Sequence, residues 1–326
     1  MPAFLKNVQN TAHRFDLWKR GDKILVAVSG GPDSMCLLDI SFCLSKKYDW
    51  SLHIAHVNYG LRGKDSDLDE QLVKDRAKHY HLPLSILHPK KPRKANNLES
   101  RLRDIRYAFF EKTRKHLGFD SIALAHHQGD QAETLLLRLV RGAGLHGLGA
   151  MRPREGHLIR PLLLTPRAEI LHYLEDNALP YRLDQTNGDL VFTRNRIRHE
   201  LLPLLETFNP NIRETLAENA LSLADDAATL SQLLTDSSFL ATQETKNTLH
   251  TLNTRAFLAH SPSIQRAFLR SLIEMSTPLP QPPSFNEIEE MRKFIKSAKN
   301  KIAQKTFRGL KFTRRGGKVG VLSEKQ

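Results

Sequence analysis

The chain has 326 residues, 40% of them hydrophobic and 26% charged, and its formal net charge is +14 at pH 7. This is the composition of a globular protein, and the absence of any run of about 18 apolar residues excludes a membrane-spanning helix. The charge excess favours a polyanionic partner, with nucleic acid first, although a basic surface kept for solubility would have the same composition.

The two cysteines, Cys36 and Cys43, form no C-x-x-C pair. This excludes a zinc ribbon or an iron–sulfur cluster held by cysteines. Lone thiols suit a reducing cytoplasm, where both would act as small buried hydrophobic residues. Residues 1–18 are amphipathic and interrupted by charge, unlike a secretory signal. We therefore expect a cytoplasmic protein.

Four short apolar runs in the first half have the length of buried strands: 23–28, 51–57, 83–88 and 121–126. Longer stretches with helical spacing follow them: 34–48, 66–81, 99–117 and 130–142. This alternation predicts an α/β fold with a parallel sheet and helices on both faces. Ligands of such sheets bind beyond the carboxyl ends of the strands, so polar segments at those ends are the candidate site.

The second part of the chain differs in character from about residue 206–215 onwards. Residues 211–306 have mostly helical spacing of Leu and Ala, and residues 306–326 predict two short strands around a Gly316-Gly317 turn. We expect two domains, 1–210 and 211–326, of which the second is mainly helical.

The first predicted strand runs directly into a glycine-rich loop. Its residues are Ser29, Gly30, Gly31, Pro32, Asp33 and Ser34. The glycines allow a tight turn that brings backbone N–H groups onto an anion, the serines add hydroxyl donors, and the following helix adds its positive end. The loop lacks the Lys of a Walker-type loop. Asp33 would hold Mg²⁺ bound to phosphate, or cap the helix. Such a loop suits the pyrophosphate half of ATP and AMP-forming chemistry.

A carboxylate–imidazole cluster follows the fourth predicted strand. Asp130 and Glu133 share a helix face, and His126 and His127 precede them. The cluster fits catalysis. It also fits a capping box with Asp130 as N-cap and Glu133 at the third helical position, or a metal site made by His126, Asp130 and Glu133.

Arginines gather at two further places. Arg101, Arg103 and Arg106 begin the long helix, where one could stabilise a phosphate in the transition state or bind a carboxylate by its fork. "RNRIRH" contains Arg194, Arg196 and Arg198, which suit contacts to the phosphates of ATP or of a nucleic acid. In both places the alternative is a solvated face.

Residues 291–318 are rich in Lys and Arg, with Phe294, Phe307 and Phe312 interleaved. A basic surface with aromatic side chains suits RNA, through phosphate contacts and stacking. The alternative places the phenylalanines in the core.

"SGGPDS" is identified as the signature of the PP-loop ATP pyrophosphatases, which adenylate a substrate and release pyrophosphate. Four further stretches, 56–62, 97–110, 125–151 and 181–205, resemble the tRNA(Ile)-lysidine synthetases. The resemblance spans about residues 23–206 and implies an adenine nucleotide α-hydrolase-like fold. It implies ATP-dependent ligation of free L-lysine to C2 of the wobble cytidine of tRNA(Ile) with a CAU anticodon. An adenylated cytidine would be the intermediate, and AMP and pyrophosphate the by-products. ATP and Mg²⁺ would be the cofactors, and a homodimer is compatible with the family.

The resemblance also implies residue roles. Residues 29–34 would bind ATP, with Asp33 serving the Mg²⁺ and pyrophosphate, and His56 would lie near the adenosine, although a lone strand-end His is as often structural. Arg106 would act on the α-phosphate. Asp130 and Glu133 would bind the lysine ammonium groups beside His126. The family usually has two aspartates in "HHxDDQ", and Gly129 replaces the first of them here.

Three alternatives remain. A sulfur-inserting PP-loop enzyme usually relies on paired cysteines, which this sequence lacks. A small-molecule synthetase of the same fold would not need the basic second domain or "RNRIRH". A non-catalytic RNA-binding protein would not need both the loop and the carboxylate cluster.

Overall fold

The computed structural model describes residues 3–90, 98–183, 193–235, 240–241, 250–276, 283–297 and 302–323. Contacts divide the chain into two compact units, Met1–Leu137 with Met151–Ala220 and Arg138–Ala150 with Leu221–Gln326. Each unit is described by itself. We predict that residues 1–210 form a catalytic domain and residues 211–326 a tRNA-binding domain. This assignment of functions stays a prediction. In the described part of the chain no helix is long and apolar enough to cross a membrane.

The first unit contains a six-stranded sheet of order β3-β2-β1-β4-β6-β5. Its strands are β1 (Lys23–Ala27), β2 (Ser51–Val57), β3 (Leu84–Leu87), β4 (Ser121–Ala123), β5 (Arg154–Glu155) and β6 (Leu158–Ile159). All pairs are parallel except β5 with β6. The predicted parallel α/β fold is therefore confirmed, and β1 lies between β2 and β4. The chain leaves β1 toward β2 and only later returns to β4, so the crevice for a ligand opens at the end of β1.

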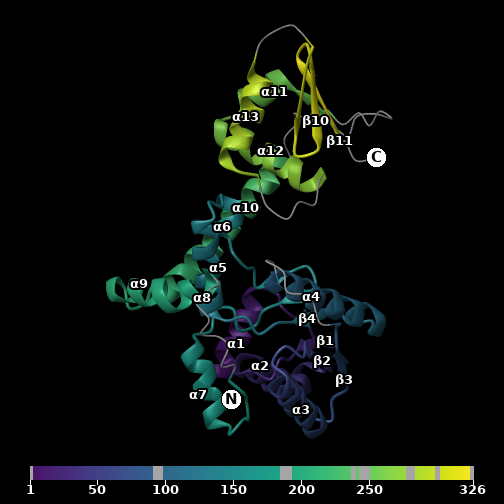
Figure 1. Ribbon diagram of the computed structural model, residues 1–326, viewed down its shortest axis with the longest axis vertical. Helices are drawn as coiled ribbons and strands as arrows, with labels where there is room; N and C mark the ends of the chain where they lie inside the picture. Colours follow the sequence, from purple (N-terminus) through teal and green to yellow (C-terminus); the bar gives the residue numbers. More distant parts are fainter. Residues whose placement is uncertain are drawn as a thin grey trace. The chain divides into compact units, whose positions relative to one another are not determined.

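Helices cover both faces of this sheet (Figure 1). They are α1 (Ala3–Arg14), α2 (Pro32–Tyr48), α3 (Lys64–His79), α4 (Leu98–Leu117) and α7 (Arg167–Asp176). The helix α5 (Gln128–Val140) follows β4 in the chain. Along β1, Ile24 and Val26 pack into the core that includes α1, α2 and α7, whereas Leu25 packs with Phe110 of α4. Successive side chains of a strand point to opposite faces, so a strand buried on both faces is apolar throughout.

A short helical segment completes the unit. It consists of α8 (Thr193–Arg196), a π-helical turn (Ile197–Leu201), α9 (Leu202–Phe208) and the start of α10 (Ile212–Thr235). Ile197 and Leu202 are buried against Ala132 and Leu136 of α5. This packing brings "RNRIRH" next to the helix that carries the predicted carboxylates.

The second unit combines helices with an antiparallel sheet of order β7-β8-β11-β10-β9. The strands are β7 (Leu240–Ala241), β8 (His250–Asn253), β9 (Ala303–Phe307), β10 (Leu310–Arg315) and β11 (Lys318–Ser323). The helices are α6 (Leu145–Leu148), most of α10, α11 (Thr254–Ala259), α12 (Pro262–Ser276) and α13 (Phe285–Lys296), of which α11–α13 lie beside the sheet (Figure 1). The predicted helices and hairpin are confirmed, but β8 and β9 lie in a region that helical spacing alone did not identify as strand.

The phenylalanines of the basic stretch belong to the core of this unit. Phe312 is fully buried, Phe307 is buried, and Phe294 packs against them. Their ring centroids are 5.5 and 6.2 Å apart, in edge-to-face pairs. Of the two interpretations of these phenylalanines, the core placement is therefore confirmed and stacking on RNA bases is wrong. Lys299 and Lys301 of the stretch lie outside the described residues.

Candidate active site

The loop between β1 and α2 has the geometry of an anion-binding turn. Gly30 has a φ of +94°, which glycine adopts without strain. The Ser29 N–H donates to Ser34 Oγ at 3.1 Å, and Ser34 Oγ donates to the Gly31 carbonyl at 2.9 Å. Gly31 precedes the helix and has no side chain to cap it. No side chain therefore caps the N-terminus of α2, and the positive end of the helix dipole is available to an anion.

Asp33 lies in the first turn of α2 and is not its N-cap, so the capping alternative for this residue is wrong. Its Oδ1 atom is buried and has no hydrogen-bond partner, while Arg167 Nε and His127 Nε2 each lie 4.0 Å from the carboxylate. Burial raises the pKa of Asp33, and the nearby His127 and Arg167 oppose that rise. A buried carboxylate oxygen without a donor suits a cation.

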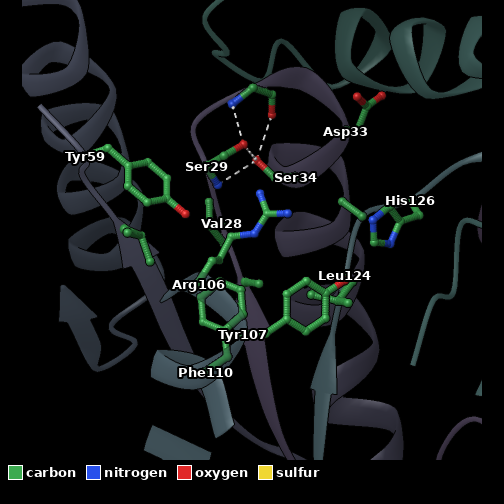
Figure 2. Close-up of a pocket in the computed structure, with 14 residues that line it drawn as sticks. Val28, Ser29, Asp33, Ser34, Tyr59, Arg106, Tyr107, Phe110, Leu124 and His126 are labelled. Carbon is green, nitrogen blue, oxygen red and sulfur yellow. Dashed lines mark hydrogen bonds between the residues drawn. The ribbon is translucent and has the colours of Figure 1, made fainter. Parts of the chain in front are cut away.

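A cavity of about 230 Å³ opens beside the loop at the ends of β1, β2 and β4 (Figure 2). Its walls include the apolar side chains of Val57, Phe110 and Leu124 and the ring of Tyr107. The loop forms its polar end. An apolar slot ending on N–H and hydroxyl donors suits a flat base joined to phosphates.

Arg106 is the arginine of the long helix that lines this cavity. Figure 2 shows its guanidinium pointing toward Ser29 and Ser34, with Tyr59 on one side and His126 on the other. Arg103 does not line the cavity, although its guanidinium lies 5.3 Å from the centroid of the Tyr107 ring, which Arg106 also approaches. Among the three predicted arginines, the geometry thus favours Arg106 for a role on phosphate.

The two predicted histidines have different surroundings. His126 lines the cavity, its Nδ1 atom is buried without a hydrogen-bond partner, and burial lowers its pKa to about 3. His126 is therefore neutral at physiological pH. His56 does not line the cavity: its Nδ1 bonds the Val28 carbonyl at 2.8 Å and its ring is buried. His56 thus holds the backbone at the end of β1 by a hydrogen bond.

A second cavity, of about 570 Å³, lies on the other side of the loop and shares Ser29, Gly31 and Asp33 with the first. Its further lining is strongly charged: Arg62, Asp69, Asp130, Arg167, Arg182 and Arg198. A ligand on the loop therefore borders an apolar compartment on one side and a charged one on the other.

Asp130 and Glu133 form an ion-pair cluster with two arginines of "RNRIRH". Glu133, 2% exposed, accepts from Arg198 Nε at 2.6 Å and from Arg194 Nε at 3.0 Å. Arg194 Nη2 also lies 3.3 Å from Asp130 Oδ1. Burial acts to raise the pKa of Asp130, but His127, His126 and Arg194 together lower it. Arg196 points elsewhere and pairs with Glu200 at 3.0 Å.

The start of α5 is capped differently from the predicted box. His127 precedes the helix, and its Nδ1 atom accepts the Gly129 N–H at 3.0 Å. Asp130 Oδ2 in turn accepts the His127 N–H at 3.0 Å. The capping pair is therefore His127 with Asp130, three residues earlier than predicted, and Glu133 is not part of it. No group of three metal-ligating side chains occurs among the described residues, so the alternative of a metal site built from His126, Asp130 and Glu133 is not supported.

The sequence pattern of the PP-loop domain family matches residues 3–205, which include both cavities. The chain belongs to the PP-loop family. It is 45% identical over 238 residues to a tRNA(Ile)-lysidine synthase of Geobacter sulfurreducens, a match that covers 71% of this chain and 50% of the relative. It is 34% identical over 294 residues to one of Porphyromonas gingivalis, covering 86% and 63%. The chain thus spans about half the length of the first of these curated relatives.

A solved structure shares the PP-loop fold. The U34-tRNA thiolase NcsA of Methanococcus maripaludis, with its [4Fe-4S] cluster, has a TM-score of 0.58 and 19% identity to this chain. The match covers 68% of this chain and 79% of the thiolase. At this identity the likeness concerns the fold alone.

The PP-loop of this chain rests on a group of charged residues that sequence reasoning missed. A Cβ on Gly30 would lie 3.3 Å from the Cβ of Asp69 on α3. Asp69 pairs with Arg62 and, at 2.8 Å, with Arg182, whose own N–H donates to the Gly30 carbonyl. Asp69 and Arg182 are 113 residues apart in sequence, so no local pattern joins them. The one usable sign in the sequence was the glycine itself, a residue type that allows close backbone approach.

Proposed function

We propose that this protein ligates free L-lysine to C2 of the wobble cytidine of tRNA(Ile) with a CAU anticodon, using ATP and releasing AMP and pyrophosphate. One observation carries the proposal. A PP-loop with an apolar slot and Arg106 on one side borders a charged cavity on the other. Asp130 lines that cavity, and the buried Glu133 lies behind it, joined to it through Arg194. Adenylation needs the first compartment and recognition of a diamino acid needs the second. The identity to tRNA(Ile)-lysidine synthases over most of this chain supports that pairing of substrates.

The first half-reaction joins the cytidine O2 to the α-phosphate of ATP. The adenine would enter the slot lined by Phe110 and Leu124, and the phosphates would meet the N–H groups of the loop and the helix end. Arg106 would stabilise the charge that develops on the α-phosphate, because its guanidinium faces the loop. Preorganised donors of this kind act strongly in a site shielded from water.

Asp33 fits a Mg²⁺ ion that enters with ATP. Mg²⁺ takes few protein ligands and completes its shell with phosphate oxygens and water. The buried Oδ1 of Asp33, which has no hydrogen-bond partner, is such a ligand. Bound there, the ion would neutralise charge on the departing pyrophosphate.

The second half-reaction needs lysine held by its ammonium groups. Asp130 and Glu133 are the acidic pair beside the loop, and both now bind guanidinium groups of Arg194 and Arg198. An incoming ammonium would exchange with one of these guanidiniums, so the site needs no new buried charge. The ε-amine must lose a proton before it attacks C2 of the cytidine, since an ammonium has no lone pair.

The tRNA would be bound partly by the second unit. Its exposed cations include Lys293, Lys296, Arg315 and Lys318, which lie on α13 and at the β10–β11 turn. Such a surface attracts phosphates without reading sequence. In this proposal the enzyme works in the cytoplasm. A homodimer is compatible with it and is checked by light scattering.

Sulfur insertion receives no support from the thiols. Cys36 and Cys43 both lie on α2, away from the cavity linings, and burial raises the pKa of Cys36 far above neutral. A thiol held protonated is a poor nucleophile.

The experiment is a ligation assay with purified protein, Mg²⁺, ATP, radiolabelled lysine and either tRNA(Ile) (CAU) or the same tRNA with uridine at the wobble position. Label in the first tRNA only, with stoichiometric AMP, supports the proposal. AMP and pyrophosphate formed with tRNA but without lysine incorporation would move the nucleophile to another molecule. No tRNA-dependent ATP use would refute the proposal.

A further inference from the structure

Tyr59 connects two walls of the smaller cavity. It follows β2 in the chain, and it lines the cavity together with Arg106 of α4. Its hydroxyl donates to the carbonyl of Leu102 on α4 at 2.7 Å, although the two residues are 43 positions apart in sequence. Figure 2 shows this hydroxyl turned toward the side of the cavity where Arg106 lies. One hydrogen bond therefore joins the end of β2 to the helix that carries the proposed phosphate-binding arginine.

The Leu102 carbonyl belongs to the helical turn that ends at Arg106. In an α-helix the carbonyl of one residue accepts the N–H of the residue four positions later, so the carbonyl of Leu102 pairs with the N–H of Arg106. A carbonyl oxygen has two lone pairs and can accept the Tyr59 hydroxyl as well. A shift of this turn would shift the Arg106 guanidinium with it.

The backbone that carries Tyr59 is fixed on both sides of the residue. Asn58 is 5% exposed, and its amide donates to Glu70 Oε2 at 2.8 Å. Its Oδ1 atom accepts the Gly60 N–H at 2.8 Å, and its own N–H donates to the Leu87 carbonyl at 3.0 Å. The phenol therefore extends to α4 from a rigid base.

The first half of α4 has few anchors of its own. Of the α4 side chains that the structure describes, none before Phe110 is fully buried, and Leu102, Ile105 and Arg106 are only partly buried. A helix end with little buried surface opens locally at a low free energy. A hydrogen bond from a fixed group therefore contributes a large share of the local order there.

The hydroxyl of Tyr59 keeps its proton at neutral pH. Burial raises the pKa of Tyr59, and the nearby Arg106 opposes that rise without cancelling it. The neutral phenol is a donor, as the bond to a carbonyl requires.

We propose that Tyr59 is a positioning residue of the adenylation step, whose hydroxyl fixes the first turns of α4 and so holds the Arg106 guanidinium toward the phosphate loop. The inference rests on the proposed function, because it deepens the role given there to Arg106. Since Tyr59 acts through Arg106, its hydroxyl serves the rate of adenylation. Its ring is part of the cavity wall and serves the binding of ATP.

Four variants separate these roles. Tyr59→Phe removes the hydroxyl and keeps the ring, and it is made in the wild type and in Arg106→Ala. Tyr173→Phe is the matched control, because it also removes a hydroxyl that donates inside the first unit, to the buried Asp39 at 2.6 Å, but Tyr173 lines neither cavity. The readouts are hydrogen exchange of α4 by mass spectrometry, the Kd for Mg²⁺·ATP by calorimetry, and kcat and KM for tRNA-dependent AMP formation with tRNA(Ile) (CAU).

In Tyr59→Phe, the amides of the first half of α4 should exchange about 3- to 10-fold faster than in wild type. The kcat should fall about 10-fold, because a displaced guanidinium is costly in a preorganised site, while the Kd for Mg²⁺·ATP stays unchanged because the ring remains. In the Arg106→Ala background, Tyr59→Phe should cost nothing further in kcat. Tyr173→Phe should lower the unfolding temperature and leave kcat and the exchange of α4 at wild-type values.

Three results would overturn the inference. Wild-type exchange of α4 in Tyr59→Phe would show that the hydroxyl does not hold the helix. An equal loss of kcat with and without Arg106 would show that Tyr59 does not act through that arginine. A loss in Tyr173→Phe as large as in Tyr59→Phe would show general destabilisation. Failure of the proposed function is distinguishable, since the wild type would then form no AMP with tRNA, whereas hydrogen exchange would still test the hold of Tyr59 on α4.

Discussion

Glu70 anchors α3 to the ends of β2 and β3, and its loss should destabilise the scaffold of the phosphate loop. It is buried and accepts bonds from Asn58 Nδ2 at 2.8 Å and His88 Nε2 at 2.7 Å, while Lys74 Nζ lies 2.7 Å away. The preceding residue, Asp69, lies so close to Gly30 of the loop that a Cβ there would be 3.3 Å from its own Cβ. Glu70→Gln keeps the shape of the side chain and removes its charge.

The magnitude follows from the pKa of Glu70. Burial acts to raise this pKa, but the bonds from Lys74, Asn58 and His88 outweigh it and bring the pKa from 4.5 to about 2. A difference of this size corresponds to about 3 kcal/mol of folding free energy at neutral pH. The side chains of Lys74 and His88 are 47% and 61% exposed, so solvent screening reduces the expected loss to about 2 kcal/mol. Because the folded pKa is the lower one, this stability is present above pH 4.5 and is lost as the pH falls toward 2.

The assay is urea unfolding of wild type and Glu70→Gln at pH 7, 5, 4 and 3. The two proteins should differ by about 2 kcal/mol at pH 7. The difference should shrink below pH 4.5, because the Glu70 carboxylate of the unfolded wild type then binds a proton while that of the folded protein is still ionised. Glu175→Gln, an exposed glutamate of α7, should differ from wild type by less than about 0.5 kcal/mol. A difference for Glu70→Gln that stays constant over this pH range would refute the reasoning, because charge would then not be its cause.

Three further variants test the proposed chemistry. Asp130→Asn keeps an oxygen that accepts the His127 N–H, so the variant should unfold at the wild-type temperature. Its rate of lysine ligation should fall at least about 100-fold. Ligation at the wild-type rate would show that Asp130 only caps the helix. Arg106→Lys keeps the positive charge but loses the two parallel hydrogen bonds that a guanidinium donates. The kcat of tRNA-dependent AMP formation should therefore fall about 100-fold, with little change in the Kd for ATP. An unchanged kcat would show that Arg106 has no part in the chemistry. Neutralising the two exposed cations at the β10–β11 turn, by Arg315→Gln and Lys318→Gln, should lower the slope of log Kd for tRNA against log salt by about 2, measured by filter binding. An unchanged slope would place the tRNA elsewhere.

The parallel sheet and the phosphate loop could be predicted because their determinants are local. Ile24, Leu25 and Val26 are all apolar since β1 is buried on both faces. The two glycines and two serines of the loop then follow directly at the strand end. In the second unit, the Gly316-Gly317 turn likewise identified the hairpin.

The charge pairing of the site could not be predicted in the same way. Glu133 and Arg198 are 65 residues apart in sequence, and their contact depends on Ile197 and Leu202 packing against α5. The cap of α5 was misplaced because Asp130 and Glu133 have the spacing of a capping box, whereas a histidine ring nitrogen takes the N-cap role instead. Phe307 and Phe312 were ambiguous because burial of an aromatic residue in a basic strand depends on which face meets the core.

The way the two units share the chain has a practical consequence for dissecting the protein. Residues 138–150 belong with the second unit although residues on both sides of them belong to the first. One proteolytic cut near residue 220 therefore cannot release the units cleanly, because the first fragment would retain a segment whose neighbours are in the other. Limited digestion should yield two fragments that stay associated until they are denatured, and neither unit can be produced whole as one uninterrupted stretch of polypeptide.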